Sequence, residues 1–103
     1  MRVFSPRYSR QQVLDALQAA VPRLRGLLPL RRVVLFGSYA RGDFTAASDV
    51  DVLVVYADPP REDAFSAVYK AAGLRNLQLH VFAEKVEARW RRQLAEGVVV
   101  YEE

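Results

Sequence analysis

The chain has 103 residues, of which 51% are hydrophobic and 26% charged, and this composition is typical of one globular domain spanning residues 1–103. It has no cysteine, which excludes disulfides, zinc–thiolate sites and thiol catalysis. No apolar run approaches the roughly 20 residues of a membrane helix. The N-terminal stretch is unlike a signal peptide, so we expect a cytoplasmic protein without a membrane partner.

The net charge is +3, and it is unevenly distributed along the chain. Residues 1–42 contain eight arginines and one acidic residue, whereas residues 43–103 contain seven basic and eleven acidic residues. A basic N-terminal part can attract a polyanion, but the simpler interpretation is a solvated, arginine-rich helix surface. Because no nucleic-acid-binding motif is visible, we do not expect nucleic acid as a direct ligand.

The first predicted element is an amphipathic helix that starts after Ser9, which matches a capping box with Gln12. Its apolar residues recur at helical spacing, and they are Val13, Leu14, Leu17, Val21, Leu24 and Leu28. Pro22 is predicted to kink this helix or to start a second one, and Gly26 and Pro29 are predicted to end it.

Strands and helices alternate through the middle of the chain. Strands are predicted at residues 31–36, 49–56 and 76–82, where β-branched or alternating apolar residues occur. The first strand stops at Gly37-Ser38, and the following YARGDF predicts one or two helical turns. After Asp58-Pro59-Pro60 breaks the chain, apolar residues at helical spacing predict a helix from Ala64 to Ala72 that ends at Gly73.

The C-terminal segment predicts a last helix, because Val86, Trp90 and Leu94 fall four residues apart and Gly97 follows them. Trp90 either packs in the core or anchors an interface. The VVVYE tail is either an edge strand or a docked extension. This order of elements predicts a small α/β or α+β fold in which helices pack on a sheet.

Two carboxylates stand at the start of the second strand. Asp49 and Asp51 share one face of it with Leu53 and Val55, about 7 Å apart along the strand. Carboxylates at this spacing repel each other unless they face water or converge on a cation such as Mg²⁺. The pair alone therefore indicates either a metal site or a solvated strand start.

Gly37 and Ser38 follow an apolar strand and precede a helical turn, so their backbone N–H groups can face a phosphate. Arg41 lies three residues further on, where it can reach a phosphate or pair with Asp43. The pattern is not a P-loop, because GxxxxGK[ST] is absent. Alone, it also fits an ordinary tight turn between a strand and a helix.

Taken together, GSYARGDFTAASDVDVLV resembles the signature of the DNA polymerase beta-like nucleotidyltransferase superfamily. The stretch is similar to minimal nucleotidyltransferases (MNT) of the MntA-like antitoxin type, and LHVFAEKVEARW followed by GVVVYEE is similar to their C-terminal part. The resemblance covers nearly the whole chain. It implies a small nucleotidyltransferase fold with a mixed sheet of about three to four strands.

The resemblance also implies a reaction, the transfer of a nucleoside monophosphate from an NTP, which we expect to be ATP, to an acceptor. Gly37 and Ser38 would hold the triphosphate, with Arg41 beside it, and Asp49 and Asp51 would bind one or two Mg²⁺ ions. Those ions would offset charge on the α-phosphate and on the pyrophosphate leaving group.

Active members of the superfamily carry a third carboxylate on a later strand, and the best-matching position here is Gln78. Glutamine can offer a metal its carbonyl oxygen, but it carries no charge and accepts no proton. His80 lies on the same strand face and is either a general base or a hydrogen-bonded strand residue.

This departure leaves two functions open. In the first, the protein transfers AMP to an acceptor as the antitoxin half of a pair with a HEPN-domain protein. In the second, it is a nucleotide-binding module with little or no transfer activity that neutralises its partner by binding alone.

Overall fold

A computed structural model describes residues 8–45, 47–85 and 96–103 of the chain. The described elements are α1 (Arg10–Leu27), β1 (Leu30–Phe36), α2 (Ser38–Arg41), β2 (Val50–Tyr56), α3 (Ala64–Ala72), β3 (Leu77–Ala83) and β4 (Val98–Glu102). Their order confirms the predicted alternation, and the tail forms a strand. The predicted helix at Val86, Trp90 and Leu94 lies outside the described residues.

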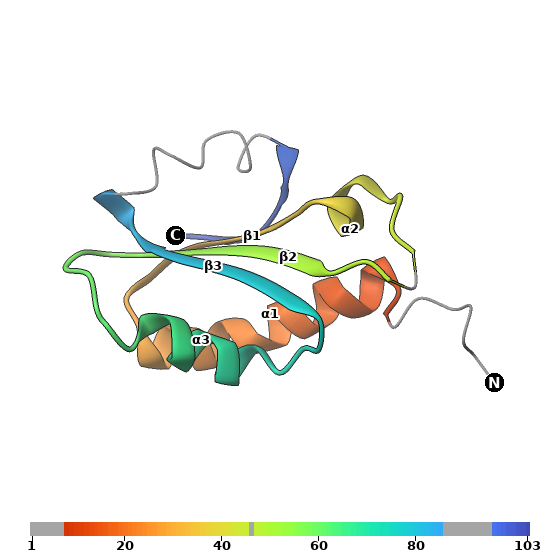
Figure 1. The fold of residues 1–103 in the computed structure, drawn as a ribbon. Helices are drawn as coiled ribbons and strands as arrows, with labels where there is room; N and C mark the ends of the chain where they lie inside the picture. The colour runs from red at the N-terminus through yellow and green to blue at the C-terminus, as the bar shows by residue number, and fades with distance from the viewer. Residues whose placement is uncertain (1–7, 46, 86–95) are drawn as a thin grey trace.

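The described strands form a four-stranded sheet in the order β3-β2-β1-β4. β1 runs antiparallel to both β2 and β4, whereas β2 and β3 are parallel, so the sheet is mixed as predicted. Helices α1 and α3 lie together on one face of the sheet, and α2 lies at the end of β1 (Figure 1). This is the mixed α/β architecture expected from the sequence.

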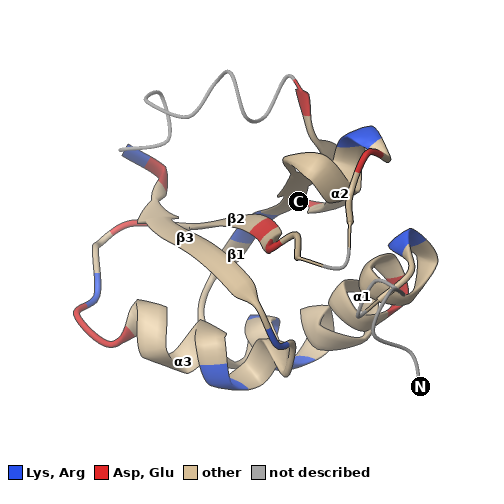
Figure 2. Cartoon of the chain, turned by 45° about the vertical axis from the view of Figure 1, so that its right-hand side comes forward, with Lys and Arg blue, Asp and Glu red and all other residues tan. Residues whose placement is uncertain are grey.

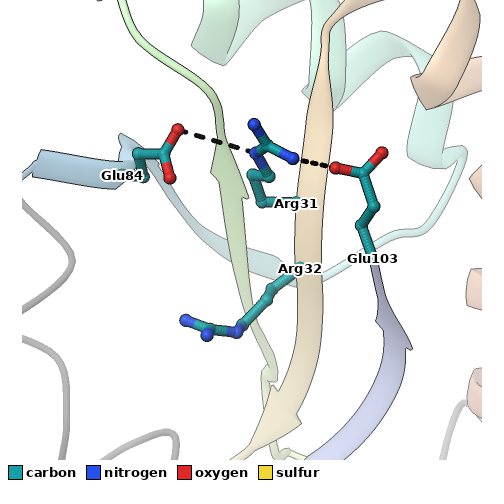
Figure 3. A pocket seen from close by; sticks show the side chains of 4 residues that line it. All are labelled: Arg31, Arg32, Glu84 and Glu103. Carbon is teal, nitrogen blue, oxygen red and sulfur yellow. Dashed lines mark hydrogen bonds and ion pairs between the residues drawn. The ribbon is translucent and has the colours of Figure 1, made fainter.

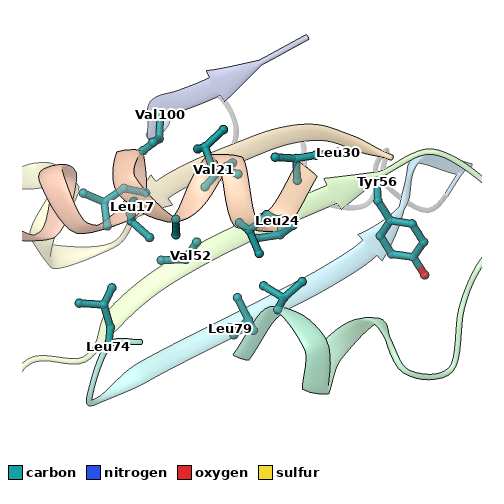
Figure 4. Close-up of a cluster of buried hydrophobic side chains, with 14 of the residues drawn as sticks. Leu17, Val21, Leu24, Leu30, Val52, Tyr56, Leu74, Leu79 and Val100 are labelled. Carbon is teal, nitrogen blue, oxygen red and sulfur yellow. The ribbon is translucent and has the colours of Figure 1, made fainter. Parts of the chain in front are cut away.

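Buried side chains lie on both faces of the sheet. On the helix-covered face, Val52 and Val54 of β2 pack with α1 residues such as Leu17 and Leu24, as Figure 4 shows for part of this cluster. On the other face, Leu53 and Val55 pack with Val34, Phe36 and Phe82. Asp51 has the same parity along the strand as Leu53 and Val55, so the side chain points away from α1 and α3, which agrees with the predicted alternation.

Helix α1 begins as predicted, and it ends at Leu27, between the two predicted end residues Gly26 and Pro29. The Gln12 backbone N–H donates to Ser9 Oγ (3.0 Å) and the Ser9 N–H donates to Gln12 Oε1 (2.8 Å), which completes the capping box. The prediction that Pro22 starts a second helix is wrong, because the helix runs through it, and Gly26 also lies inside. Buried Val21 and Leu24 hold this segment against the sheet, and this packing outweighs the hydrogen bond that a proline cannot donate.

Several arginine side chains donate to carbonyl groups near the C-terminal end of a helix to which they do not belong. The pairs are Arg10 with Tyr39 and Ala40 of α2, Arg23 with Ala71 of α3, and Arg61 with Leu27 of α1. Helix C-terminal carbonyls lack partners within their own helix and favour cations. Arg10 and Arg23 therefore have structural contacts, which supports the simpler interpretation of the basic N-terminal part.

The described part of the chain contains no helix that is long and apolar enough to cross a membrane.

Candidate functional site

Gly37 forms the turn between β1 and α2. Its backbone has φ 75° and ψ −153°, a region that essentially only glycine occupies. The N–H groups of Ala40 and Arg41 both donate to the Gly37 carbonyl at 3.1 Å, which closes the single turn of α2. The structure therefore contains the tight turn that the Gly37-Ser38 pair predicts, and Ser38, which is partly exposed, is the first residue of α2.

The carboxylate of Asp51 lies directly against this turn. Phe36 and Asp51 are partners in the antiparallel register of β1 and β2, which brings the next residue, Gly37, beside the Asp51 side chain. A Cβ atom placed on Gly37 would lie only 2.2 Å from Asp51 Oδ2. Glycine is thus required here both for its backbone angles and for the space that the carboxylate occupies.

Asp51 is partly buried, whereas Asp49 lies just before β2 and is exposed. Burial raises the pKa of Asp51 above its ordinary value of 3.8, and the charge of Asp49 raises it further. Charge interactions with His80 and Arg41 act on this pKa in the opposite direction. Figure 2 shows acidic positions at the start of β2. A partly buried carboxylate beside a second one is a place where a cation relieves repulsion.

The donor set fits Mg²⁺, which is commonly held by one or two protein carboxylates together with substrate phosphates. Among the described residues there is no cluster of three or more histidine, cysteine or acidic side chains placed to hold a metal. Asp49 and Asp51 would therefore hold a cation with help from a substrate or from neutral oxygen atoms. Because Gly37 has no side chain, the Asp51 carboxylate can lie beside the turn.

Gln78 and His80 lie on the strand next to Asp51. In the parallel register of β2 and β3, Asp51 is the partner of Gln78, and Leu53 is the partner of His80. Register partners share a sheet face, so Gln78 lies beside Asp51 where a third acidic ligand is expected. The His80 ring lies 5.6 Å from the Phe36 ring, centroid to centroid, and the planes are tilted by 42°. The structure thus brings Gly37, Asp51, Gln78 and His80 together on one face.

The Arg41 side chain lies at the edge of this group. Its Nε donates to Asp43 Oδ2 at 3.3 Å, and both side chains are more than half exposed. This pairing is the alternative that the sequence left open for Arg41. An exposed ion pair of this kind contributes little to stability, so it can open to let the guanidinium contact another anion.

The contacts that hold α2 in place were not predicted from the sequence. Tyr39 is fully buried, stacks on Phe44 at 4.2 Å between ring centroids, and donates its hydroxyl to the Tyr8 carbonyl at 3.2 Å. The sequence predicted Tyr39 only as part of a short helical turn. Its neighbours Tyr8 and Arg10 are about 30 residues away along the chain, so no local pattern reveals them.

A pocket of about 210 Å³ lies elsewhere, lined by Arg31, Arg32, Glu84 and Glu103 (Figure 3). It is at the start of β1, whereas Gly37 follows the end of that strand. Arg31 forms ion pairs with Glu84 (3.5 Å) and with Glu103, so the charges that line the pocket are largely paired with one another. We therefore assign the candidate site to the Gly37–Asp51 region.

Comparisons with known proteins concern the family and the fold of the chain. A family model described as a nucleotidyltransferase domain matches residues 14–101. A relative from Methanocaldococcus jannaschii, provisionally named a protein adenylyltransferase, is 39% identical over 57 residues. The match spans 55% of this chain and 58% of the relative, so the chain covers less than two thirds of that protein.

Solved structures share the fold. A provisionally named nucleotidyltransferase from Sulfolobus solfataricus matches with a TM-score of 0.70 and 26% identity, over 91% of this chain and 84% of that one. A chain in the complex of a tri-AMPylated Shewanella oneidensis HEPN toxin with an MNT antitoxin matches with a TM-score of 0.56 and 19% identity. That match covers 87% of this chain and 73% of the other, and at this identity it shows the fold alone.

Proposed function

The chain belongs to the nucleotidyltransferase domain family, and from this premise we propose that it binds Mg²⁺-ATP and transfers AMP to a protein acceptor. The observation that carries the proposal is the placement of the Asp51 carboxylate against the Gly37 turn. The two lie so close that a Cβ atom on Gly37 would overlap the carboxylate. A phosphate-binding turn and a metal-binding carboxylate must lie this close, because both act on the same triphosphate.

Each residue has a distinct role in this proposal. The backbone of Gly37 and Ser38 contacts the triphosphate, and Arg41 exchanges Asp43 for a phosphate oxygen. Asp49 and Asp51 hold one or two Mg²⁺ ions. When bound, the metal supplies stabilisation of negative charge on the α-phosphate and on the departing pyrophosphate.

The transfer step forms a bond between an acceptor oxygen and the α-phosphorus and breaks the bond from that phosphorus to the pyrophosphate oxygen. The acceptor hydroxyl must lose a proton, and Gln78 cannot accept it. His80, two residues along the same strand, is the candidate base because its ring lies on the same face. We therefore expect transfer that is slower than in a protein with a third carboxylate at this position.

The acceptor that we propose is a HEPN-domain protein, with this chain as the antitoxin of a toxin–antitoxin pair. The name of the Methanocaldococcus relative supports a protein acceptor, and the Shewanella complex holds an AMPylated HEPN toxin beside an antitoxin of the same fold. The alternative function is a nucleotide-binding module that neutralises its partner by binding alone, and the amide at position 78 favours it.

Purification of the chain with its native partner, followed by intact-mass measurement of that partner, tests the proposal. We expect the partner to carry the added mass of one or more AMP groups when co-expressed with wild type and none with Asp51→Asn. A stoichiometric but unmodified partner in both samples would contradict transfer and support the binding module. A modified partner in both samples would contradict the role of Asp51.

A further inference from the structure

Helix α2 cannot hold its own position. It has four residues, one turn, from Ser38 to Arg41. Isolated helices shorter than about 12 residues are marginal in water, so the geometry of a single turn depends on the contacts around it. Ser38, the first residue of α2, forms the proposed phosphate-binding turn together with Gly37, so contacts made by the rest of α2 influence the site.

Arg10 provides such a contact. Its Nε donates to the Tyr39 carbonyl at 3.1 Å and its Nη2 donates to the Ala40 carbonyl at 3.2 Å. These are charge-assisted hydrogen bonds to carbonyl groups that lack partners in so short a helix. The planar guanidinium binds two consecutive peptide groups at once. This restrains both the rotation of α2 and its distance from α1.

The helix that carries Arg10 is held rigidly. Arg10 is the first residue of α1, directly after the Ser9 cap, and the capping box fixes the backbone there. Val13 and Leu17, which follow within two turns, are buried against the sheet that carries Asp51. Arg10 therefore connects the Tyr39 and Ala40 carbonyls of α2 to the same body that positions the carboxylate.

We propose that Arg10 is a positioning residue for nucleotide binding: it acts through the Tyr39 and Ala40 peptide groups to hold the Gly37-Ser38 turn against Asp51. This inference rests on the proposed function, because it concerns the same nucleotide site. Arg10 contacts the carbonyls of the two middle residues of α2 and not the turn itself, so its effect is transmitted by the hydrogen bonds of Ala40, Arg41 and Gly42 back to residues 37 and 38.

Arg23 offers a matched control. Its Nε and Nη2 donate to the Ala71 carbonyl near the end of α3, at 3.1 and 2.9 Å. This is also a guanidinium-to-carbonyl contact made from α1, although both of its bonds end on one carbonyl, and α3 carries no residue of the site. Replacing either arginine with glutamine therefore removes an equivalent structural contact, and only one replacement disturbs the turn.

The test compares wild type, Arg10→Gln, Arg10→Lys and Arg23→Gln in two measurements. The first is hydrogen exchange of the amides of residues 40–42 in the nucleotide-free protein. The second is the Kd for Mg²⁺-ATP by isothermal titration. We expect Arg10→Gln to exchange faster at these amides and to bind about tenfold more weakly, Arg10→Lys to restore part of both, and Arg23→Gln to match wild type in both.

Equal exchange and equal Kd in Arg10→Gln and Arg23→Gln would overturn the inference while leaving the proposed function intact. Equal losses of affinity in the two variants, in proportion to a lowered Tm, would also overturn it, because they indicate general destabilisation. Absence of Mg²⁺-ATP binding by wild type would overturn the proposed function together with this inference.

Discussion

Replacement of Gly37 with alanine is the sharpest test of how the site is built. A side chain at this position must adopt φ 75° and ψ −153°, and backbone strain in such regions costs roughly 1–3 kcal/mol. The added Cβ would also lie 2.2 Å from Asp51 Oδ2, so the carboxylate must move away from the turn. A loss of about 2 kcal/mol corresponds to a decrease in Tm of about 9 °C for a chain of this size.

The control for Gly37→Ala is Gly73→Ala. Gly73 also has a positive φ, of 68°, but no atom would lie within 4 Å of an added Cβ. Thermal unfolding followed by circular dichroism measures the Tm of both variants, and isothermal titration measures their Kd for Mg²⁺-ATP. We expect both variants to unfold at a lower temperature and only Gly37→Ala to lose binding. Wild-type affinity in Gly37→Ala would refute the reasoning, because the turn and Asp51 would then not need their close approach.

Further predictions concern charge and helix ends. Because the pKa of Asp51 is raised on folding, the ionised carboxylate lowers stability at neutral pH, so metal-free Asp51→Asn should have a higher Tm than wild type. That difference should shrink as the pH falls through the raised pKa and vanish below 3.8, and a constant difference in thermal scans across pH would contradict it. Gln78→Asp should increase AMP transfer to the partner, and no increase in label incorporation would show that this position is not the third ligand. Arg61→Ala, which loses the bond to the Leu27 carbonyl, should lower the Tm by about 5 °C and leave nucleotide binding unchanged.

The parts of the site that were predictable follow from short-range periodicity. Alternation along β2 assigns Asp51 to the face opposite Val52, because successive side chains of a strand point in opposite directions. The Gly37-Ser38 pair predicts a tight turn, because a glycine after an apolar run permits backbone angles that other residues avoid. The placement of Gln78 beside Asp51 depended on the family resemblance, since no local pattern states which strands are neighbours.

The parts that were missed depend on contacts between distant segments. Arg10 donates to main-chain carbonyls 29 and 30 residues away. Every residue has a main-chain carbonyl, so the residue types do not indicate which carbonyls accept these hydrogen bonds. Pro22 predicted a kink or a second helix because a proline lacks an N–H, and the second helix does not form because buried neighbours keep α1 continuous. In both cases tertiary packing decides the outcome, and local propensity has only a small effect.

The central claim is that Asp51 and the Gly37 turn form one Mg²⁺-dependent nucleotide site. Isothermal titration of ATP into wild type and into Asp51→Ala, each with Mg²⁺ and with EDTA, tests it most directly. We expect binding to wild type with Mg²⁺, and strongly reduced binding both in EDTA and in Asp51→Ala. Equal binding by the two proteins with Mg²⁺, or binding by neither, would contradict the claim.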